Sequence, residues 1–419
     1  MSAADAEELS EPLLRRGFRR SPDLAAADAV LITTCTVRQH AEDKALSLIG
    51  TLRPWKAERP ERLLIVAGCA AERLKDWLQT RFPFIDLVVG ARSIEQFPAL
   101  AEAALGRRFD ALSEASLAEA PGAPPEDGPS AAFVTIMRGC NYACSYCIVP
   151  AVRGPELYRP AAVILEEVRK KVSEGCSEVT LLGQTVNSWR SEFEGRSVDF
   201  GGLLRLADRI EGLERVRFMS PHPYYITDGL LSALAETRTA TRWLHLPVQS
   251  GSNRLLRLMR RNYTREGFLE KTERVRRAVP GIVLSTDFIV GFPSETEEDF
   301  QQTLSLASAF KPAWAYNFKY SPREGTEAAA APDDVSRADK EARLNALTRL
   351  MERISDEAHG AQVGKTAEIL TEKEGIGRAR EGFRVVLDRP VPAGRFVTAL
   401  IHGHERQTLL GGIHASQER

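Results

Sequence analysis

The stretch Gly139-Cys-Asn-Tyr-Ala-Cys-Ser-Tyr-Cys147 follows the apolar run Phe133–Met137, and this junction decides the fold of the second half of the chain. It places Cys140, Cys144 and Cys147 within eight residues, on a loop after a predicted strand. Soft thiolate ligands favour iron–sulfur clusters or zinc. A structural zinc ion needs a further cysteine or histidine, and this stretch has none. We therefore predict a cluster with three protein ligands, in which one iron stays open to a substrate or cofactor.

The strand before this stretch is the first of six predicted strands between residue 132 and about residue 330. Short apolar runs alternate there with helical patterns, including those over Pro160–Glu174 and Glu295–Phe310. Strand–helix units in such a row are typical of an open parallel sheet or of a partial barrel. The predicted strands are Phe133–Met137, Glu178–Leu182, Val216–Met219, Trp243–Val248, Val283–Val290 and Ala315–Tyr320.

The N-terminal residues alternate in the same way. An amphipathic helix is predicted over Asp5–Phe18, and buried strands over Ala29–Thr34, Arg62–Ala67 and Ile85–Val89. Alternating strands and helices predict a doubly wound parallel α/β domain. Residues 113–131 are rich in Ala, Pro, Gly and acidic residues and poor in bulky apolar side chains. Since such a segment cannot bury a core, we predict a linker there.

The C-terminal part begins with a charged helical pattern, Ser336–His359, and continues with apolar runs at 366–372, 383–387 and 396–402. Glycine and proline separate these runs, as in a small β-barrel. The predicted organisation is an α/β domain at 1–112, the linker at 113–131, a barrel core at 132–358 and a β-barrel at 360–415.

The composition narrows the class of protein. Hydrophobic residues make up 43% of the 419 residues and charged residues 27%, as in a soluble globular protein. The net charge is −1, so nucleic-acid binding has to come from local basic patches. We see no signal peptide and no membrane span, and six cysteines are too few for a disulfide scaffold. A cytoplasmic location is expected.

The spacing C-x3-C-x2-C after a strand is similar to the signature of radical S-adenosylmethionine (SAM) enzymes. The resemblance implies that Cys140, Cys144 and Cys147 hold a catalytic 4Fe–4S cluster and that the methionyl group of S-adenosylmethionine chelates the open iron. It also implies reductive cleavage to a 5′-deoxyadenosyl radical and the fold of a radical SAM partial (βα)6 barrel.

The flanking strings resemble the methylthiotransferase branch of that superfamily. They include CSYCIVPAVRG from Cys144, LLGQTVNSW from Leu181, HLPVQSGSN from His245 and STDFIVGFPSET from Ser285. Together these strings closely resemble the MiaB-type tRNA-2-methylthio-N6-isopentenyladenosine synthases. The resemblance implies methylthiolation of C2 of N6-isopentenyladenosine at position 37 of tRNA. It also implies an electron donor such as flavodoxin or ferredoxin and an unidentified sulfur source, and we expect a monomer.

Several residues are predicted to bind S-adenosylmethionine. They lie at the C-terminal ends of predicted strands, where barrels place their sites, or in the cysteine loop. Each of them is also compatible with an ordinary polar or packing role. These residues are Tyr146, Gln184, Asn187, Ser220, Gln249, Val290 and Gly291.

Cys35 and Cys69 each follow an apolar run and so are expected at the same edge of the N-terminal sheet. By composition alone, each is better explained as a small buried residue. The resemblance implies instead that they hold an auxiliary 4Fe–4S cluster. The third cysteine of that site would follow a strand that should precede residue 1. Either the chain start is misassigned, the chain is shortened, or the cysteine is absent, and two protein ligands would hold a cubane poorly.

Basic side chains are concentrated over residues 242–277, with ten Arg or Lys against three Glu. A solvated helix face explains this equally well, but Arg257, Arg260 and Arg261 are predicted to contact RNA phosphates. The C-terminal β-rich segment resembles the TRAM module, a small RNA-binding barrel. That resemblance implies RNA contacts at Lys365 and Arg378.

Two other functions are compatible with the sequence. One is a tRNA methylthiotransferase that acts on threonylcarbamoyladenosine. The other is an RNA-binding relative that is defective in sulfur insertion because an auxiliary-cluster cysteine is missing.

Overall fold

The computed structural model describes residues 2–37, 39–118 and 130–413. These form two compact units. The first contains the N-terminal domain together with the segments Arg138–Tyr142 and Cys147–Glu156. The second contains Ala143–Tyr146 and the remaining described residues. The loop with the three clustered cysteines therefore contributes residues to both units.

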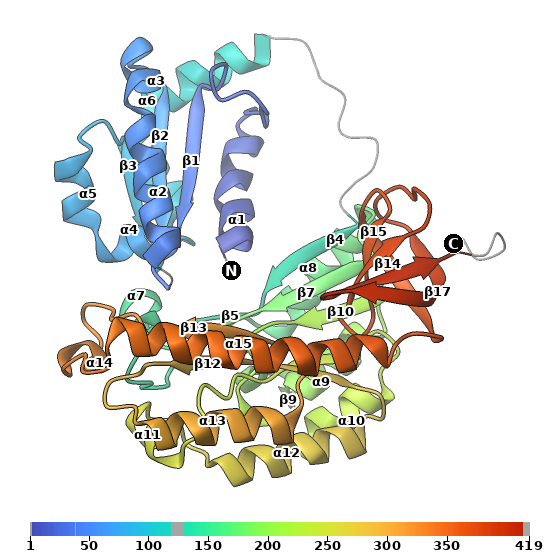
Figure 1. The fold of residues 1–419 in the computed structure, drawn as a ribbon. Coiled ribbons are helices and arrows are strands. Elements are labelled where there is room, and N and C mark those ends of the chain that lie inside the picture. The colour runs from blue at the N-terminus through green and yellow to red at the C-terminus, as the bar shows by residue number, and fades with distance from the viewer. Residues whose placement is uncertain (1, 38, 119–129, 414–419) are drawn as a thin grey trace. The chain divides into compact units, whose positions relative to one another are not determined.

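The first unit is built on a parallel sheet in the order β1-β2-β3 (Figure 1). β1 pairs with β2 in register from Ala29↔Leu63 to Thr34↔Gly68. The strands are β1 (Ala29–Thr34), β2 (Leu63–Gly68) and β3 (Leu87–Gly90). The helices are α1 (Ser2–Arg15), α2 (Gln39–Thr51), α3 (Arg53–Glu58), α4 (Cys69–Arg73), α5 (Lys75–Arg81) and α6 (Phe97–Ala118).

Every residue of β2 is buried because helices cover both faces of the sheet. Leu9 of α1 and Phe97 of α6 pack on one face. Ile49 of α2, Trp55 of α3 and Leu78 of α5 pack on the other. The prediction of a doubly wound α/β domain is confirmed.

The second unit contains six parallel strands in two three-stranded sheets, β10-β7-β4 and β11-β12-β13. Among the described residues, one isolated parallel bridge, Val216↔Ala240, links β10 to the segment just before β11. The strands are β4 (Ala131–Thr135), β7 (Glu178–Leu182), β10 (Arg215–Phe218), β11 (Trp243–His245), β12 (Val283–Val290) and β13 (Trp314–Lys319). The predicted partial barrel of six strand–helix units is confirmed.

Helices pack on the outside of these strands. In α8 the buried residues Ala161, Ile164, Leu165 and Val168 follow the helical spacing of one face. Figure 1 shows α15 running alongside β12 and β13. The helices are α8 (Ala161–Ser173), α9 (Phe200–Ala207), α10 (Asp228–Glu236), α11 (Asn253–Leu258), α12 (Arg265–Ala278), α13 (Glu297–Phe310), α14 (Glu327–Ala330) and α15 (Arg337–Gly360).

Shorter elements lie between residues 137 and 225, and α7 among them belongs to the first unit. They are β5 (Met137–Arg138), α7 (Val149–Arg153), β6 (Leu157–Tyr158), the 3₁₀ turns Val186–Ser188 and Pro223–Tyr225, and the hairpin of β8 (Arg190–Phe193) and β9 (Arg196–Asp199).

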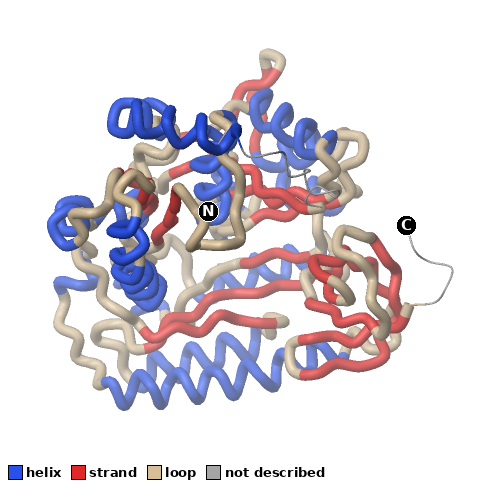
Figure 2. The backbone as a smooth tube through the Cα atoms, turned by 90° about the horizontal axis from the view of Figure 1, so that it is seen from above, coloured by secondary structure: helices blue, strands red, loops and turns tan. Residues whose placement is uncertain are grey.

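The C-terminal strands close into a five-stranded barrel in the order β14-β15-β16-β18-β17. Figure 2 shows this group of short strands in red. They are β14 (Thr366–Lys373), β15 (Ile376–Ala379), β16 (Arg384–Leu387), β17 (Phe396–Glu405) and β18 (Thr408–Gly412). The predicted small β-barrel is confirmed, although β15 and β18 were not among the predicted strands.

The predicted linker at 113–131 overlaps both neighbouring elements, since α6 continues to Ala118 and β4 begins at Ala131. Residues 119–129 lie outside the described residues. The boundaries of the four predicted segments remain predictions. In the described part of the chain, no helix is both long and apolar enough to cross a membrane.

Candidate active site

The three clustered cysteines lie on the loop between β5 and α7. All three side chains are partly exposed. The loop begins at Gly139, whose φ is 77°, and a Cβ there would lie 1.9 Å from the Pro155 carbonyl oxygen. Only glycine fits that position. Among the described residues, no three or more His, Cys, Asp or Glu side chains are gathered closely enough to hold a metal ion. The loop thus keeps the thiols within one short segment but does not bring them to one point.

Arg261 contacts Cys144 in the middle of the loop, and both residues belong to the second unit. The Nη1 of Arg261 lies 3.3 Å from Cys144 Sγ, and its Nε donates to the Tyr263 hydroxyl at 2.8 Å. Burial lowers the pKa of Arg261, but Tyr146, Tyr263 and Cys144 outweigh burial and raise the pKa well above its usual value. A permanent positive charge therefore lies beside a candidate cluster ligand.

This position bears on one RNA-binding prediction. Arg261 was expected to face phosphates, but its guanidinium also donates to the Pro247 carbonyl oxygen and stacks 5.1 Å from the Tyr263 ring. Each of its three nitrogens thus has a partner inside the protein, which disfavours a contact with RNA. Arg257 is exposed, and Arg260 forms an ion pair with Glu327 at 2.6 Å.

Ser220 and Gln249, at the ends of β10 and β11, have φ values of 62° and 73°. Non-glycine residues rarely adopt this left-handed conformation, which costs about 1–3 kcal/mol and concentrates at functional sites. Gln184, after β7, has a buried Oε1 without a hydrogen-bond partner among the described atoms. Cofactor binding by these three residues is compatible with this geometry and stays a prediction.

Asn187 makes two hydrogen bonds to the backbone of the loop after β10. Its Nδ2 donates to the His222 carbonyl oxygen at 3.0 Å, and its Oδ1 accepts from the His222 amide at 2.7 Å. The two bonds engage both ends of the amide. Asn187 therefore holds the loop after β10 in place, and cofactor binding by its side chain stays a prediction.

Val290 and Gly291 lie at the C-terminal end of β12. The Val290 side chain is fully buried in the main core, among residues of the outer helices. Gly291 has a φ of 71°, and a Cβ there would lie 2.3 Å from the Lys340 side chain. Its amide donates to Glu295 Oε2 at 2.6 Å. The Lys340 side chain makes a close approach that requires glycine here, and the adenine contact stays a prediction.

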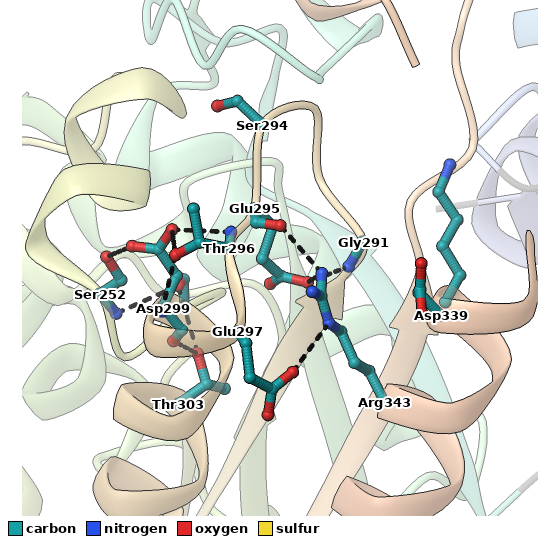
Figure 3. A network of polar contacts seen from close by, with 12 residues as sticks. Ser252, Gly291, Ser294, Glu295, Thr296, Glu297, Asp299, Thr303, Asp339 and Arg343 are labelled. Carbon is teal, nitrogen blue, oxygen red and sulfur yellow. Dashed lines mark hydrogen bonds and ion pairs between the residues drawn. The ribbon is translucent and has the colours of Figure 1, made fainter. Parts of the chain in front are cut away.

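Figure 3 shows the polar network that follows Gly291. The carboxylate of Glu295 is completely buried and is held by Arg343 Nη1 at 2.9 Å. Burial raises the pKa of Glu295, although the hydrogen bond from Gly291 and the charge of Arg343 act in the opposite direction. This pair ties the end of β12 to α15.

The same figure shows Asp299 of α13, which the sequence analysis missed. Its carboxylate accepts from the Ser252 hydroxyl at 2.5 Å and from the Thr296 amide at 2.9 Å, and it pairs with Arg254. Burial opposes ionisation, but the hydrogen bonds from Arg254, Ser252 and Thr296 hold its pKa well below the usual value. The Thr-x-x-Asp capping box at Thr296 was the signal available in the sequence.

In the first unit, Cys35 and Cys69 directly follow the last register pair of β1 and β2, Thr34↔Gly68. Adjacent strands lie about 4.8 Å apart, so the two cysteines are neighbours. Cys69 is 5% exposed, and burial raises its pKa although Arg153 opposes this.

Arg153 belongs to a buried charge network that sequence reasoning also missed. Its Nε lies 3.3 Å from Cys69 Sγ, and its Nη2 pairs with Asp5 at 2.6 Å. Asp5 pairs as well with Arg138 at 2.7 Å. Arg138 precedes Cys140 by two residues and Arg153 follows Cys147 by six, so one carboxylate of α1 holds both ends of the cysteine loop.

The other predicted RNA contacts lie on the C-terminal barrel. Lys365 is exposed at the start of β14. Arg378 donates to Glu372 at 2.9 Å and to the Gly382 carbonyl oxygen at 3.2 Å, which leaves it only partly available.

A partial strand–helix barrel with C-x3-C-x2-C on the loop after its first strand defines the class of radical SAM enzymes. Residues 134–307 match the family model described as "Radical SAM superfamily". Residues 1–90 match the model described as "Uncharacterized protein family UPF0004". A solved radical S-adenosylmethionine methyltransferase, TsrM from Kitasatospora setae, has a similar fold. The TM-score is 0.54 at 15% identity, over 76% of this chain and 70% of that one.

Curated relatives narrow the class. The chain is 44% identical over 387 residues to the tRNA-2-methylthio-N(6)-dimethylallyladenosine synthase of Thermobifida fusca. The aligned region covers 92% of this chain and 78% of the relative. The chain is 42% identical to the synthase of Streptomyces coelicolor, over 95% of this chain and 79% of that one. The chain belongs to the tRNA-2-methylthio-N(6)-dimethylallyladenosine synthase family.

Proposed function

We propose that this chain adds a methylthio group to C2 of N6-isopentenyladenosine (dimethylallyladenosine) beside the anticodon of tRNA. The identity of 44% and 42% to synthases of that name, over 92% and 95% of the chain, carries the proposal. An aromatic C2–H bond is too weakly acidic for removal by an ordinary base, which is why the reaction needs radical chemistry.

Cys140, Cys144 and Cys147 would hold the 4Fe–4S cluster. The donor set fits in ligand type, since three partly exposed thiols share one loop and Arg261 places a positive charge 3.3 Å from one of them. When bound, the cluster supplies the electron that generates a 5′-deoxyadenosyl radical from S-adenosylmethionine. Gln184, Ser220 and Gln249 would bind the cofactor, and Tyr146, which packs against Leu255 and Phe292, would form an apolar wall.

Cys35 and Cys69 would supply two thiolates to an auxiliary cluster. Their adjacency across β1 and β2 and the contact of Arg153 with Cys69 support this assignment. The guanidinium of Arg153 has a buried Nη1 without a hydrogen-bond partner among the described atoms, as expected for a donor to an anionic sulfur.

The exposed side chains of Arg257 and Lys365 would contact tRNA phosphates. The enzyme would be a cytoplasmic monomer that receives electrons from a flavodoxin or ferredoxin. The donor of the sulfur atom is unidentified.

Mass spectrometry of tRNA nucleosides tests this function. A strain lacking its own synthase, complemented with this chain, should accumulate 2-methylthio-N6-isopentenyladenosine. Accumulation of 2-methylthio-threonylcarbamoyladenosine instead would show the sister activity. Unmodified isopentenyladenosine, at normal protein levels, would show a relative that does not insert sulfur.

A further inference from the structure

A cavity of about 310 Å³ lies in the second unit, between β13, the end of α15 and the C-terminal barrel. This volume is at the lower end of the range for small-molecule sites, about 300–1,000 Å³. Trp314 and Tyr316 line it from β13, and Phe383, Arg384 and Gln407 line it from the C-terminal barrel. The strand-end residues of the candidate active site are not part of its lining.

The aromatic walls of this cavity are rigid. The Trp314 ring packs edge-on against Phe383 at 5.6 Å and lies 5.5 Å from Trp243. A Cβ on Gly382, whose φ is 87°, would lie 2.9 Å from the Trp243 ring. The barrel therefore approaches these rings as closely as a glycine permits, and the rings have little freedom to close the cavity.

Tyr316 provides an open aromatic surface. It is 47% exposed, which is unusual for a large ring on a strand, and its ring is backed by His245 at 5.9 Å. Aromatic side chains that are fixed on one side and open on the other are the usual platforms for unstacked nucleobases.

The charge of the cavity is positive. Arg384 is exposed and forms no ion pair or side-chain hydrogen bond within the part of the chain that the structure describes. The second arginine, Arg378, keeps one face toward the cavity. No acidic residue is among the described residues that line it. A flat ring surface next to an unpaired guanidinium, with a side-chain amide from Gln407, matches the base and phosphate of a nucleotide.

We propose that this cavity binds one unstacked nucleotide of the tRNA that flanks the target adenosine, with its base on Tyr316 and its phosphate at Arg384. Tyr316 lies three residues, about 10 Å, before the end of β13, so the cavity is too far from the strand ends to hold the target base itself. This proposal rests on the proposed function, because it takes tRNA as the substrate.

The test uses the full-length chain and an anticodon stem-loop RNA that contains N6-isopentenyladenosine. Tyr316→Leu should weaken binding about tenfold through the loss of stacking, and Tyr316→Phe should bind like the wild type. Arg384→Gln should weaken binding and lower the log–log salt slope by about 0.7. Arg349→Gln, at an exposed arginine on α15 outside the cavity, is the matched control and should change neither.

A 4-thiouridine at the positions that flank the adenosine should cross-link to the peptide that contains Tyr316. Wild-type affinity in both Tyr316→Leu and Arg384→Gln, or cross-links that map elsewhere, would overturn the cavity proposal while tRNA modification by the wild type persists. A wild type that neither binds nor modifies the RNA would overturn the proposed function and this inference together. Circular dichroism confirms that each variant is folded.

Discussion

Arg261 shows how much a single side chain depends on its tertiary setting. It stands in a run of basic residues, and composition places it on an RNA-binding face. The structure turns its guanidinium toward Cys144 and Tyr263, where three polar partners and an aromatic ring satisfy it. We infer that it supports the cysteine loop.

Arg261→Gln should therefore lower the affinity of the reconstituted protein for iron by about 10- to 100-fold, as is typical when a partner of a metal ligand is removed. Affinity for tRNA should change little. Iron content and filter binding of tRNA measure the two effects. Arg257→Gln, at an exposed position, is the control and should show the reverse pattern. Normal iron binding with weakened tRNA binding in Arg261→Gln would contradict this role.

His222 lies close to Arg261 and carries a pH dependence. Burial, followed by the charges of Arg261 and Lys271, lowers its pKa to about 2. In the unfolded chain the pKa is about 6.5. Above that pH the ring is neutral in both states. Below it only the unfolded chain takes up the proton, so the free energy of unfolding falls by up to about 1.4 kcal/mol per pH unit.

His222→Asn should remove this component. Urea unfolding at pH 7.5 and pH 5.5 measures it, and the wild type should lose more stability over that interval than the variant. Equal losses in the two proteins would show that His222 is protonated in the fold.

At the scale of elements, the strands were the most predictable feature. β1, β7 and β12 begin and end where their apolar runs do. β15 and β18 escaped prediction because they are short and contain glycines, and only closure of the barrel pairs them. Local patterns report burial well, but they do not report partners that are distant in the chain.

The same limit applied to the site. The cysteine loop was evident from its spacing alone. Arg153 contacts Asp5, 148 positions away, and Cys69, 84 positions away, and no local pattern encodes these contacts. Strain at Ser220 and Gln249 was equally invisible, because it depends on how strand ends meet their loops.

β10 and the C-terminal barrel are joined through one buried arginine. Arg215 is 0% exposed, donates to the Arg378 carbonyl oxygen at 3.0 Å and to Glu368 at 3.3 Å, and lies 3.5 Å from Glu178. Removing one partner of a buried ionic group is costly because the other partner stays desolvated.

Arg215→Ala should lower the free energy of unfolding by about 3 kcal/mol and make the C-terminal barrel easier to cleave by protease. Urea titration and limited proteolysis measure these effects. Arg238→Ala, at a half-exposed arginine paired with Glu214, should cost less than about 1 kcal/mol. Equal effects of the two substitutions would mean that Arg215 does not join the two parts.

At the scale of the whole molecule, the radical reaction should depend on the three thiols of the cysteine loop. The stability of the fold should not depend on these thiols. The loop is entered and left through Gly139 and Gly154, and its backbone is tied by the bond from the Cys140 amide to the Gly154 carbonyl oxygen. This backbone hydrogen bond does not need a thiol.

Replacing Cys140, Cys144 and Cys147 together by Ala should therefore leave the circular dichroism spectrum and melting temperature nearly unchanged. Cleavage of S-adenosylmethionine in the presence of dithionite should fall to background. Cys176→Ala, at a cysteine outside the loop, is the control and should retain cleavage. Formation of 5′-deoxyadenosine at the wild-type rate by the triple variant would refute the assignment.

The seam between β10 and β11 has an evolutionary consequence. A short insertion beside Ala240 disturbs the bridge to Val216, whereas the same change inside β12 or β13, which are paired over six positions, would shift a whole ladder. The circumference of the barrel can therefore change at this bridge while the other strand pairs keep their register. In a lineage that acquires bulkier substrates, insertions should therefore gather just before β11 rather than inside β12 or β13.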